Sequence, residues 1–267
     1  MPAIFDTHAH YDNAQFDEDR DTLLAGMPAN SVGLILNAAC DLNSTAASVA
    51  LAEQYPFIYA SAGIHPHETA AAPGDWLEQL KHFLQHEKCV AIGEIGLDYH
   101  YDFSPRVVQR RLFEAQMALA AELHLPVIIH EREALTDTLE MLQTFRGQVT
   151  GVFHCFSNSV ETARTVLNLG YDIALGGTVT FKNAHYAPLV AAYTPADRLL
   201  VETDCPYMAP VPMRGRRNDS TFLHYTVETI AALRNETSEE ISAQTYQNGC
   251  RLFGIPASAA ASSTKGN

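Results

Sequence analysis

Histidines and carboxylates stand at or near the ends of several short apolar segments of this sequence. The residues in these positions are His8, His10, His65, Glu94, His130, His154, Glu202 and Asp204. Imidazole nitrogens with carboxylate oxygens suit zinc, manganese, nickel or iron better than calcium, whereas magnesium prefers an oxygen-rich shell. The set exceeds the four ligands of one tetrahedral ion. These residue types therefore predict two divalent ions per subunit, with Mg, Mn and Zn all left open.

The spacing of these residues predicts which way their side chains point. Residues two apart on a strand lie on the same face of a sheet, so His8 and His10 are expected to point together. The same spacing pairs each later residue with an apolar one, in the sets Ile92 with Glu94, Ile128 with His130, Val152 with His154, and Leu200 with Glu202 and Asp204. An apolar layer with a polar layer above it is therefore expected inside the fold. Carboxylates buried in such a layer need cations or metal ions as partners.

A single histidine at a strand end is more often a hydrogen-bonded structural residue than a ligand. A metal site is predicted because many such residues coincide at the same end of successive strands. Asp6 shares the predicted face of His8 and His10 but lies one pleat deeper, so we expect it to support them without binding a metal ion. Structural roles are expected for the histidines of helical and loop segments, which are His82, His86, His124, His185 and His224, and His100 is left unassigned.

Short β-branched segments alternate along the chain with longer amphipathic ones, a pattern typical of parallel strands joined by crossover helices. The predicted strands are 3–10, 32–39, 57–65, 90–98, 126–132, 151–156, 171–177 and 199–204. In the helix that follows the fourth strand, Ser104 is expected as the N-cap and Pro105 in the first turn. Eight such units predict an α/β fold, a closed (β/α)8 TIM barrel, whose site lies at the carboxyl ends of the strands.

One domain is the simplest organisation for this chain, because no Gly/Ser-rich linker divides it. We predict a barrel domain over residues 1–256 and a flexible C-terminal tail over residues 257–267. An open doubly wound sheet is the alternative. That fold carries a glycine-rich phosphate turn after its first strand, where this chain has His8 and His10.

Charge and composition limit the partners and the location of the protein. The 267 residues carry a formal net charge of −14, so the overall field repels polyanions and a phosphate substrate needs a local cluster of donors. Arg132 near one strand end, and Arg214, Arg216 and Arg217 in the loop after the last strand, are the candidates. The five cysteines are scattered, and neither a leader nor a membrane-length apolar run is evident. These features favour a cytoplasmic protein with no membrane association, and no obligatory protein partner is expected.

Six segments carry a family resemblance. They are FDTHAHYD, GIHPHE, AIGEIGLDYHYDFSPRVVQRRLFEAQMALAAELHLPVIIHERE, GVFHCFS, GGTVTFKN and LLVETDCPYMAPVPMRGRRND. They resemble the TatD family of metal-dependent deoxyribonucleases, within the amidohydrolase superfamily, and the resemblance covers residues 4–254. The chain departs from the family pattern at Glu133, where aspartate is more common, and at Gly249, where alanine is usual.

This resemblance implies a TIM barrel that uses a water molecule activated by two metal ions to hydrolyse DNA phosphodiester bonds, often as a 3′-to-5′ exonuclease. The implied ligands are His8, His10 and Asp204 for the first ion, His130 and His154 for the second, and Glu94 as the bridge. Many amidohydrolases bridge their metals with a carboxylated lysine instead. No lysine lies in a predicted strand of this chain, which agrees with a carboxylate bridge.

Catalytic and substrate-binding roles follow as hypotheses. Asp204 is expected to bind metal and to accept the proton of the attacking water, with Glu94 as the second catalytic carboxylate. Glu202 is expected either to partner Asp204 or to form a salt bridge at the barrel mouth. The expected substrate is DNA, as single strands or 3′ ends. The expected substrate-binding residues are His65, Arg132 and Arg217, and His67 is the alternative donor beside His65.

Two other functions are consistent with the same residues. The binuclear site also suits another substrate, such as the ester bond of D-aminoacyl-tRNA, because the arginine-rich loop does not distinguish DNA from an RNA-linked ester. A non-catalytic, metal-dependent binding scaffold is the other alternative. Structural metal sites are coordinatively closed and often rich in thiolates, whereas this one is poor in thiolates and stands where barrel enzymes have their active sites. These differences favour an enzyme.

Overall fold

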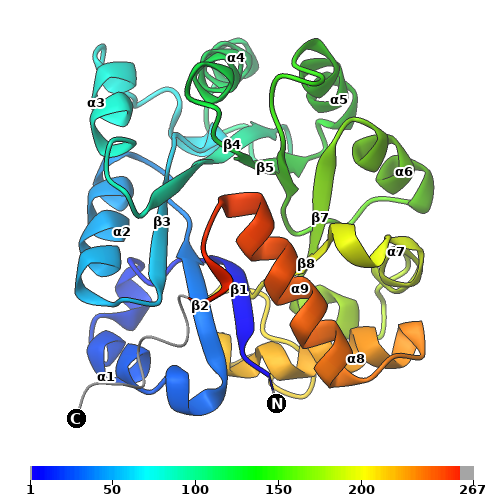
Figure 1. Ribbon diagram of the computed structural model, residues 1–267. Coiled ribbons are helices and arrows are strands. Elements are labelled where there is room, and N and C mark those ends of the chain that lie inside the picture. Colours follow the sequence, from blue (N-terminus) through cyan, green and yellow to red (C-terminus); the bar gives the residue numbers. More distant parts are fainter. Residues whose placement is uncertain (1, 259–267) are drawn as a thin grey trace.

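In the computed structural model, which describes residues 2–258, eight strands form one parallel sheet in sequential order. They are β1 (Ile4–Ala9), β2 (Val32–Asn37), β3 (Ile58–Ala62), β4 (Cys89–Asp98), β5 (Val127–Arg132), β6 (Gly151–Phe153), β7 (Tyr171–Leu175) and β8 (Leu199–Val201). Main-chain hydrogen bonds from Asp204 to the His8 carbonyl and from His10 to the Cys205 carbonyl, both 2.9 Å, close the ring. The predicted (β/α)8 TIM barrel is confirmed and the open doubly wound sheet is wrong (Figure 1).

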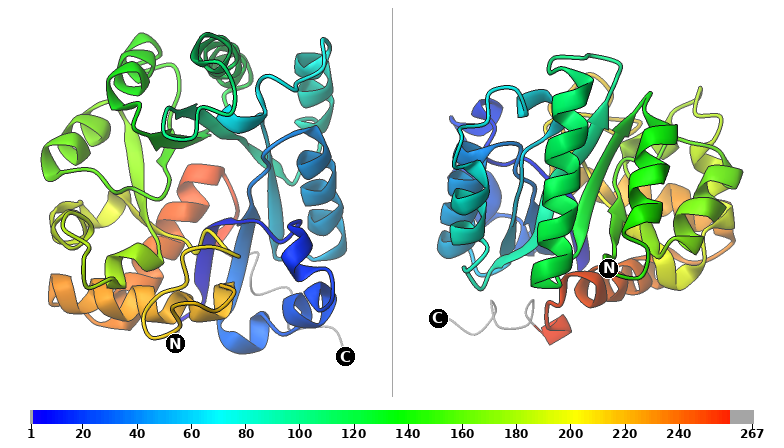
Figure 2. Two further views of the ribbon diagram at one scale, coloured as in Figure 1. Left: turned by 180° about the vertical axis from the view of Figure 1, so that it is seen from behind. Right: turned by 90° about the horizontal axis from the view of Figure 1, so that it is seen from above.

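Helices connect successive strands and lie outside the ring, whereas the last helix crosses the end at which the strands begin (Figure 2). The α-helices are α1 (Arg20–Ala25), α2 (Leu42–Gln54), α3 (Trp76–Phe83), α4 (Arg106–Leu123), α5 (Leu135–Thr144), α6 (Val160–Asn168), α7 (Ala187–Tyr193), α8 (Leu223–Arg234) and α9 (Ser238–Phe253). The short 3₁₀ helices are η1 (Ala14–Phe16), η2 (Pro28–Asn30), η3 (Pro66–Glu68), η4 (Gly177–Thr180), η5 (Ala196–Arg198) and η6 (Ser220–Phe222).

The C-terminal tail predicted over 257–267 lies outside the described residues, except for positions 257 and 258. Its flexibility and the domain boundary at 256 therefore stay predictions. Within residues 2–258, no helix has the length and the apolar character that a membrane crossing requires.

Six strands end earlier than the sequence predicts, among them β6 at Phe153 and β8 at Val201. In the loops that follow, Cys155 and Asp204 have φ angles of 45° and 56°. This left-handed region is incompatible with an extended strand. His154 and Asp204 therefore lie just beyond their strands, in loops at the carboxyl end of the barrel.

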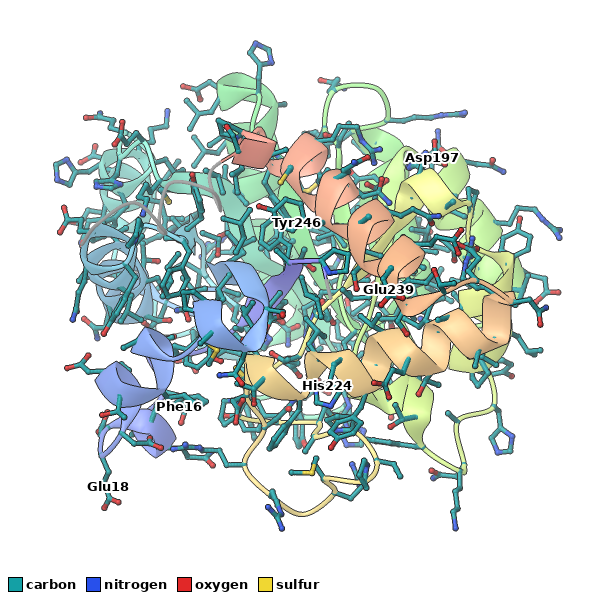
Figure 3. All side chains as sticks on the ribbon, turned by 60° about the horizontal axis from the view of Figure 1, so that its bottom comes forward. Phe16, Glu18, Asp197, His224, Glu239 and Tyr246 are labelled. Atoms are coloured by element: carbon teal, nitrogen blue, oxygen red, sulfur yellow. The ribbon has the colours of Figure 1, made fainter. Side chains whose placement is uncertain are left out.

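The interior of the barrel is apolar beneath these loops. Ile128, Val152 and Leu200 are buried and pack in one cluster with Phe5, as the predicted apolar layer requires. The cluster continues into α9, which carries Tyr246 (Figure 3). The ring of Tyr246 lies 6.2 Å from the ring of Phe5. The amino end of the barrel is thus filled by side chains, and the polar residues lie at the other end.

The predicted pairing of Ile92 with Glu94 is wrong. Ile92 packs in the cluster between sheet and helices, together with Leu112 of α4, whereas Ala91 packs in the interior cluster. The pairing of β4 with β5 shifts its register between Ile92 and Ile95, and such a shift breaks simple alternation. Glu94 faces the interior because of this irregularity.

Alternation also fails at Asp6, because the pairing of β1 with β2 shifts its register between Asp6 and Ala9. The Asp6 carboxylate accepts hydrogen bonds from the N–H and the hydroxyl of Thr203 at 2.9 and 2.7 Å, and from the hydroxyl of Ser220 at 2.6 Å. No imidazole among residues 2–258 donates to it. Asp6 therefore supports the site by fixing the residue before Asp204.

Ser104 is not the N-cap of α4, because that helix begins at Arg106 with Pro105 in the N-cap position. The Ser104 hydroxyl instead donates to the His67 carbonyl at 2.8 Å and accepts the N–H of Ala70 at 3.0 Å. The hydrogen bonds of this buried serine thus link the segment before α4 to the loop after β3.

Gly249 lies where α9 crosses the amino end of the barrel. A Cβ atom on this residue would stand 2.5 Å from Cδ1 of Phe5 and 3.2 Å from Cγ2 of Thr7. Both neighbours belong to β1, so the glycine lets the helix approach the strand that carries His8. Alanine is usual at this position in the family, and the glycine of this chain leaves room for the large ring of Phe5.

We predict that Gly249→Ala lowers the free energy of unfolding. Alanine favours a helix by about 1 kcal/mol over glycine, but overpacking a buried contact costs typically about 1–3 kcal/mol. Phe5→Leu makes room for the new methyl group. The double variant Phe5→Leu/Gly249→Ala should therefore be about 1 kcal/mol more stable than the sum of the two single effects predicts. Urea unfolding of the four proteins measures this coupling, and additive effects would show that the two residues do not compete for space.

Candidate metal centre

Side chains from the two ends of the closed ring form the first group of candidate ligand atoms. The Nε2 atoms of His8 and His10 lie 3.1 Å apart, and that of His10 lies 3.4 Å from Oδ1 of Asp204. The His8 Nε2 also lies 3.2 Å from Oε2 of Glu94. Neighbouring ligands of a tetrahedral zinc ion are about 3.3 Å apart when each bond is about 2.0–2.1 Å. The group therefore has the donor atoms and the spacing of a metal site.

A second group surrounds the other carboxylate oxygen of Glu94. Its Oε1 lies 2.8 Å from Nδ1 of His130, 3.1 Å from Nε2 of His154 and 3.4 Å from Nε2 of His65. The two oxygens of one carboxylate thus face two separate sets of imidazoles, which is the arrangement that a bridging ligand requires. The structure brings the six predicted ligands together, and their division between two ions stays a prediction.

His65, which the sequence predicts as a substrate-binding residue, is a member of the second group. It is the N-cap of η3, and its Nδ1 accepts the N–H of His67 at 3.2 Å. Burial lowers the pKa of His65 to about 4, so the ring is neutral at pH 7. A neutral ring whose Nδ1 accepts a hydrogen bond carries its proton on Nε2. His65 therefore presents an N–H donor toward the site, which supports the predicted role better than metal binding.

Hydrogen bonds fix the tautomers of two candidate ligands. In the neutral form that binds metal, the His10 ring can only donate to the Ala38 carbonyl, 2.9 Å from its Nδ1, which leaves a lone pair on Nε2. In the same form, His130, whose Nε2 lies 3.1 Å from Oδ2 of Asp98, donates to this carboxylate and keeps a lone pair on Nδ1. Such partners orient metal-binding imidazoles and raise their basicity. Both lone pairs point toward Glu94.

Glu202 lies behind His154. Its Oε1 accepts the N–H of Cys155 at 2.6 Å and lies 3.4 Å from Nδ1 of His154. The carboxylate is fully buried, so the predicted salt bridge at the barrel mouth is wrong. The contact makes Glu202 the partner of His154, rather than the predicted partner of Asp204.

Asp98 belongs to the site, although the sequence patterns did not identify it, and it brings His67 with it. Oδ2 of Asp98 lies 2.8 Å from Nε2 of His67 and 3.1 Å from Nε2 of His130. Burial alone raises the pKa of Asp98, but hydrogen bonds from His130, the Tyr101 N–H and His67 outweigh it and hold this pKa well below its usual range. The signal in the sequence is the position of Asp98, at the end of the predicted strand that contains Glu94.

Both carboxylates of the centre are ionised at neutral pH. Burial alone raises the pKa of Glu94, but the neighbouring His154 and His65 help to hold it well below its usual range. Burial also opposes ionisation of Asp204, and the hydrogen bond from His10 helps to lower its pKa. Buried anions need compensating positive charge, which divalent ions would supply. The donor set therefore fits divalent metal ions.

The predicted substrate donors Arg132 and Arg217 lie in different environments. Arg132 is exposed at the end of β5, and its guanidinium makes no hydrogen bond or ion pair with any of residues 2–258. Arg217 donates to the two carboxylate oxygens of Asp19 at 2.8 and 2.6 Å and to the Gln15 carbonyl at 2.7 Å. The structure therefore does not bring Arg217 to the candidate ligands, because its donors hold the loop after β8 to the start of α1.

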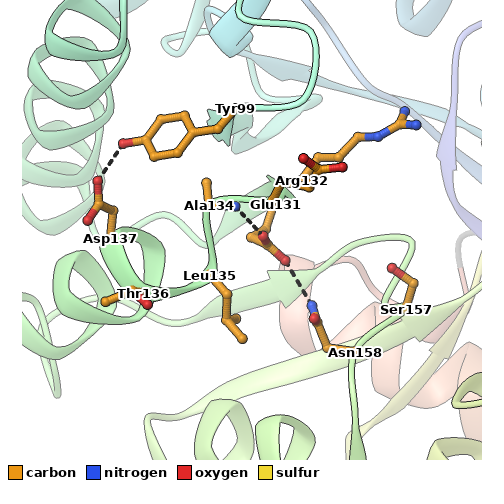
Figure 4. A pocket seen from close by; sticks show the side chains of 10 residues that line it. Tyr99, Glu131, Arg132, Ala134, Leu135, Thr136, Asp137, Ser157 and Asn158 are labelled. Carbon is orange, nitrogen blue, oxygen red and sulfur yellow. Dashed lines mark hydrogen bonds between the residues drawn. The ribbon is translucent and has the colours of Figure 1, made fainter.

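A pocket of about 560 Å³ opens beside Arg132, beyond the end of β5 (Figure 4). On its floor, the Glu131 carboxylate accepts hydrogen bonds from the Ala134 N–H and from the side-chain amide of Asn158, both 2.8 Å. The pocket is next to the strand end that carries His130.

A TIM barrel with buried imidazoles and carboxylates at the carboxyl end of its strands defines the class of metal-dependent hydrolases. Comparison with known families identifies the branch. Residues 5–254 match the family described as TatD related DNase, and the chain belongs to this family, as the sequence resemblance predicts.

Individual relatives agree with this assignment. The chain is 42% identical to the uncharacterized metal-dependent hydrolase YabD of Bacillus subtilis (strain 168), over 94% of this chain and 99% of that protein. It is 36% identical to the 3'-5' ssDNA/RNA exonuclease TatD of Pantoea sp. (strain At-9b), over 94% of this chain and 99% of that protein. The crystal structure of YJJV, a TatD homolog from Escherichia coli K12, has a TM-score of 0.89 and 34% identity and covers 95% of this chain and 98% of its own. The protein is thus a metal-dependent hydrolase.

We predict that Glu94→Gln removes metal and activity together. The amide keeps the shape of the side chain but lacks the negative charge that faces both groups of imidazoles. Loss of a partner in the outer shell of a metal site costs about 10–100-fold in affinity, so loss of this ligand should cost at least about 100-fold. Elemental analysis after dialysis measures the metal, with Glu122→Gln, an exposed residue of α4, as the control. Wild-type metal content in Glu94→Gln would refute the bridging role.

Proposed function

We propose that this protein is a two-metal phosphodiesterase that releases nucleotides from the 3′ end of single-stranded DNA. The observation that carries the proposal is the orientation of Glu94, whose two carboxylate oxygens face two separate groups of imidazoles. The name of the relative from Pantoea, a 3'-5' ssDNA/RNA exonuclease, supports a nucleic acid as the substrate.

Two divalent ions would activate a water molecule and stabilise the negative charge that develops on the phosphate. The residues that would hold them are His8, His10 and Asp204 for one ion, His130 and His154 for the other, and Glu94 for both. The hydrogen-bonded partners of these rings keep their lone pairs directed inward. The chain thereby provides a rigid set of ligands before any substrate arrives.

We assign to Asp204 the proton that the attacking water loses. The Asp204 side chain is 15% exposed, whereas that of Glu94 is 4% exposed, so water reaches Asp204 more readily. It is ionised at neutral pH and can therefore accept a proton. His65, with its proton on Nε2, would donate a hydrogen bond to a phosphate oxygen at the same rim.

Arg132 is the residue we assign to the capture of the phosphate backbone. Its guanidinium has no hydrogen-bonded partner within residues 2–258, so its donors are available to an incoming anion. A guanidinium fork matches two phosphate oxygens. Local capture of this kind is needed because the net charge of −14 repels a polyanion. Arg217, which the Asp19 carboxylate occupies, serves instead to hold its loop in place.

We predict that metal-loaded protein shortens a single-stranded DNA oligonucleotide from its 3′ end and that chelation stops the reaction. The assay uses oligonucleotides labelled at the 5′ end, with single-stranded RNA and D-aminoacyl-tRNA measured in parallel. A DNA oligonucleotide with phosphorothioate linkages at its 3′ end is the matched control, and it should resist shortening. Turnover of D-aminoacyl-tRNA alone would show that the protein is an esterase that uses the same centre, and not a phosphodiesterase.

We predict that Arg132→Ala raises KM for a DNA oligonucleotide about 10-fold, since a hydrogen bond to a charged group contributes about 1.5–3 kcal/mol. Its metal content and kcat should stay close to those of the wild type. Arg217→Ala should instead lower the melting temperature, because Asp19 loses its partner. Steady-state kinetics and thermal unfolding of the two variants distinguish these roles. A larger KM effect in Arg217→Ala would reverse the two assignments.

A further inference from the structure

We infer that Tyr101 and Phe103, in the loop between β4 and α4, form a stacking platform for a nucleobase next to the scissile phosphate. This inference rests on the proposed function and names a subsite for the substrate. Tyr101 is 46% exposed and Phe103 is 67% exposed, although both are large apolar side chains at the mouth of the barrel. Rings exposed beside a reaction centre mark a surface that a ligand covers.

The two rings form an ordered unit with their neighbours. Their centroids lie 5.2 Å apart with an angle of 21° between the planes, which is a stacked pair. His67 packs against both rings in T-shaped geometry, with its centroid 5.4 Å from that of Tyr101 and 4.8 Å from that of Phe103. The guanidinium carbon of Arg132 lies 4.7 Å from the Tyr101 centroid. The platform therefore adjoins the group that we assign to phosphate capture.

Asp98 connects the platform directly to the metal centre. One oxygen of its carboxylate faces the imidazoles of His67 and His130, at 2.8 and 3.1 Å. The other oxygen accepts the N–H groups of His100 and Tyr101, at 3.0 and 2.9 Å. One fully buried side chain thus fixes both a candidate metal ligand and the start of the aromatic loop. A base on the platform would lie beside a phosphate held at the metal centre.

Further hydrogen bonds hold the aromatic loop at its other end. The buried Gln109 of α4 donates to the carbonyls of Asp98 and Ser104, at 3.1 and 2.8 Å, and its oxygen accepts the Asp98 N–H at 2.9 Å. Ser104 in turn donates to the His67 carbonyl. Because the loop is fixed at both ends, the rings stay exposed without folding inward. Little ordering is left to occur when a ligand binds, which favours tight stacking.

A nucleobase is the ligand whose chemistry fits this surface. Every base has a flat π face, and stacking on an aromatic side chain is tolerant of sequence. Proteins that bind single strands combine such rings with cationic groups that contact the backbone, as Phe103 and Arg132 would do here. The net charge of −14 weakens long-range attraction for nucleic acid, so binding requires a contribution to affinity that does not depend on charge.

The test compares DNA oligonucleotides that differ only in the bases beside the scissile phosphate. One oligonucleotide is intact, one has an abasic residue in place of the 3′-terminal nucleotide, and one has it in place of the next nucleotide. The proteins are wild type, Phe103→Ala and Phe103→Trp. Tyr193→Ala is the matched control, because Tyr193 is a partly exposed aromatic residue at the far end of α7. Metal content is measured for each protein.

Phe103→Ala should raise KM for the intact oligonucleotide about 10-fold with little change in kcat and in metal content, and Phe103→Trp should restore it. With one of the two abasic oligonucleotides, Phe103→Ala should leave KM unchanged. The position of the abasic residue in that oligonucleotide is then the position of the stacked base. Equal effects on all three oligonucleotides, or none on the intact one, would overturn the platform while leaving the proposed function intact. Failure of the wild type to cleave any of them would overturn the proposed function, and the platform with it.

Discussion

Burial of the Glu94 carboxylate is the constraint on which the rest of this structure depends. An ionised carboxylate in a protein interior costs several kcal/mol unless positive charge and hydrogen bonds compensate for the lost water. Imidazoles crowd around both of its oxygens, and each ring with a defined tautomer has an outer partner such as the Ala38 carbonyl or Asp98. These groups come from different strands. A closed ring of parallel strands is the architecture that brings all of their carboxyl ends to one rim.

The same rim explains how a negatively charged protein would handle a negatively charged substrate. Divalent ions would neutralise the centre itself, and Arg132, near the end of β5, has no ionic partner within residues 2–258. Asp98 links this electrostatic part of the site to the apolar rings of Tyr101 and Phe103, because its two oxygens serve the metal centre and the loop respectively. Affinity for a nucleic acid would thus come from a few fixed groups rather than from an overall positive surface.

Regular strands behaved as the two-residue repeat predicts, and irregular strands did not. The pairs Ile128 with His130 and Val152 with His154 lie as expected, because β5 and β6 pair without a register shift. Ile92 faces the helices, and Glu94 does not share its face because β4 shifts its register against β5 between Ile92 and Ile95. A register shift arises from pairing with a neighbouring strand, so the local pattern of apolar residues did not reveal it.

The sequence by itself determined the barrel and most of the residues that meet at its rim, because the βα alternation and the polar residues at strand ends are local patterns. Only the tertiary structure decided how those residues are used. It placed Glu202 behind His154, and it brought Asp98 and His67 into the site. It also paired Arg217 with Asp19, 198 residues away along the chain. These contacts depend on distances across the closed ring, which no local spacing of residues specifies.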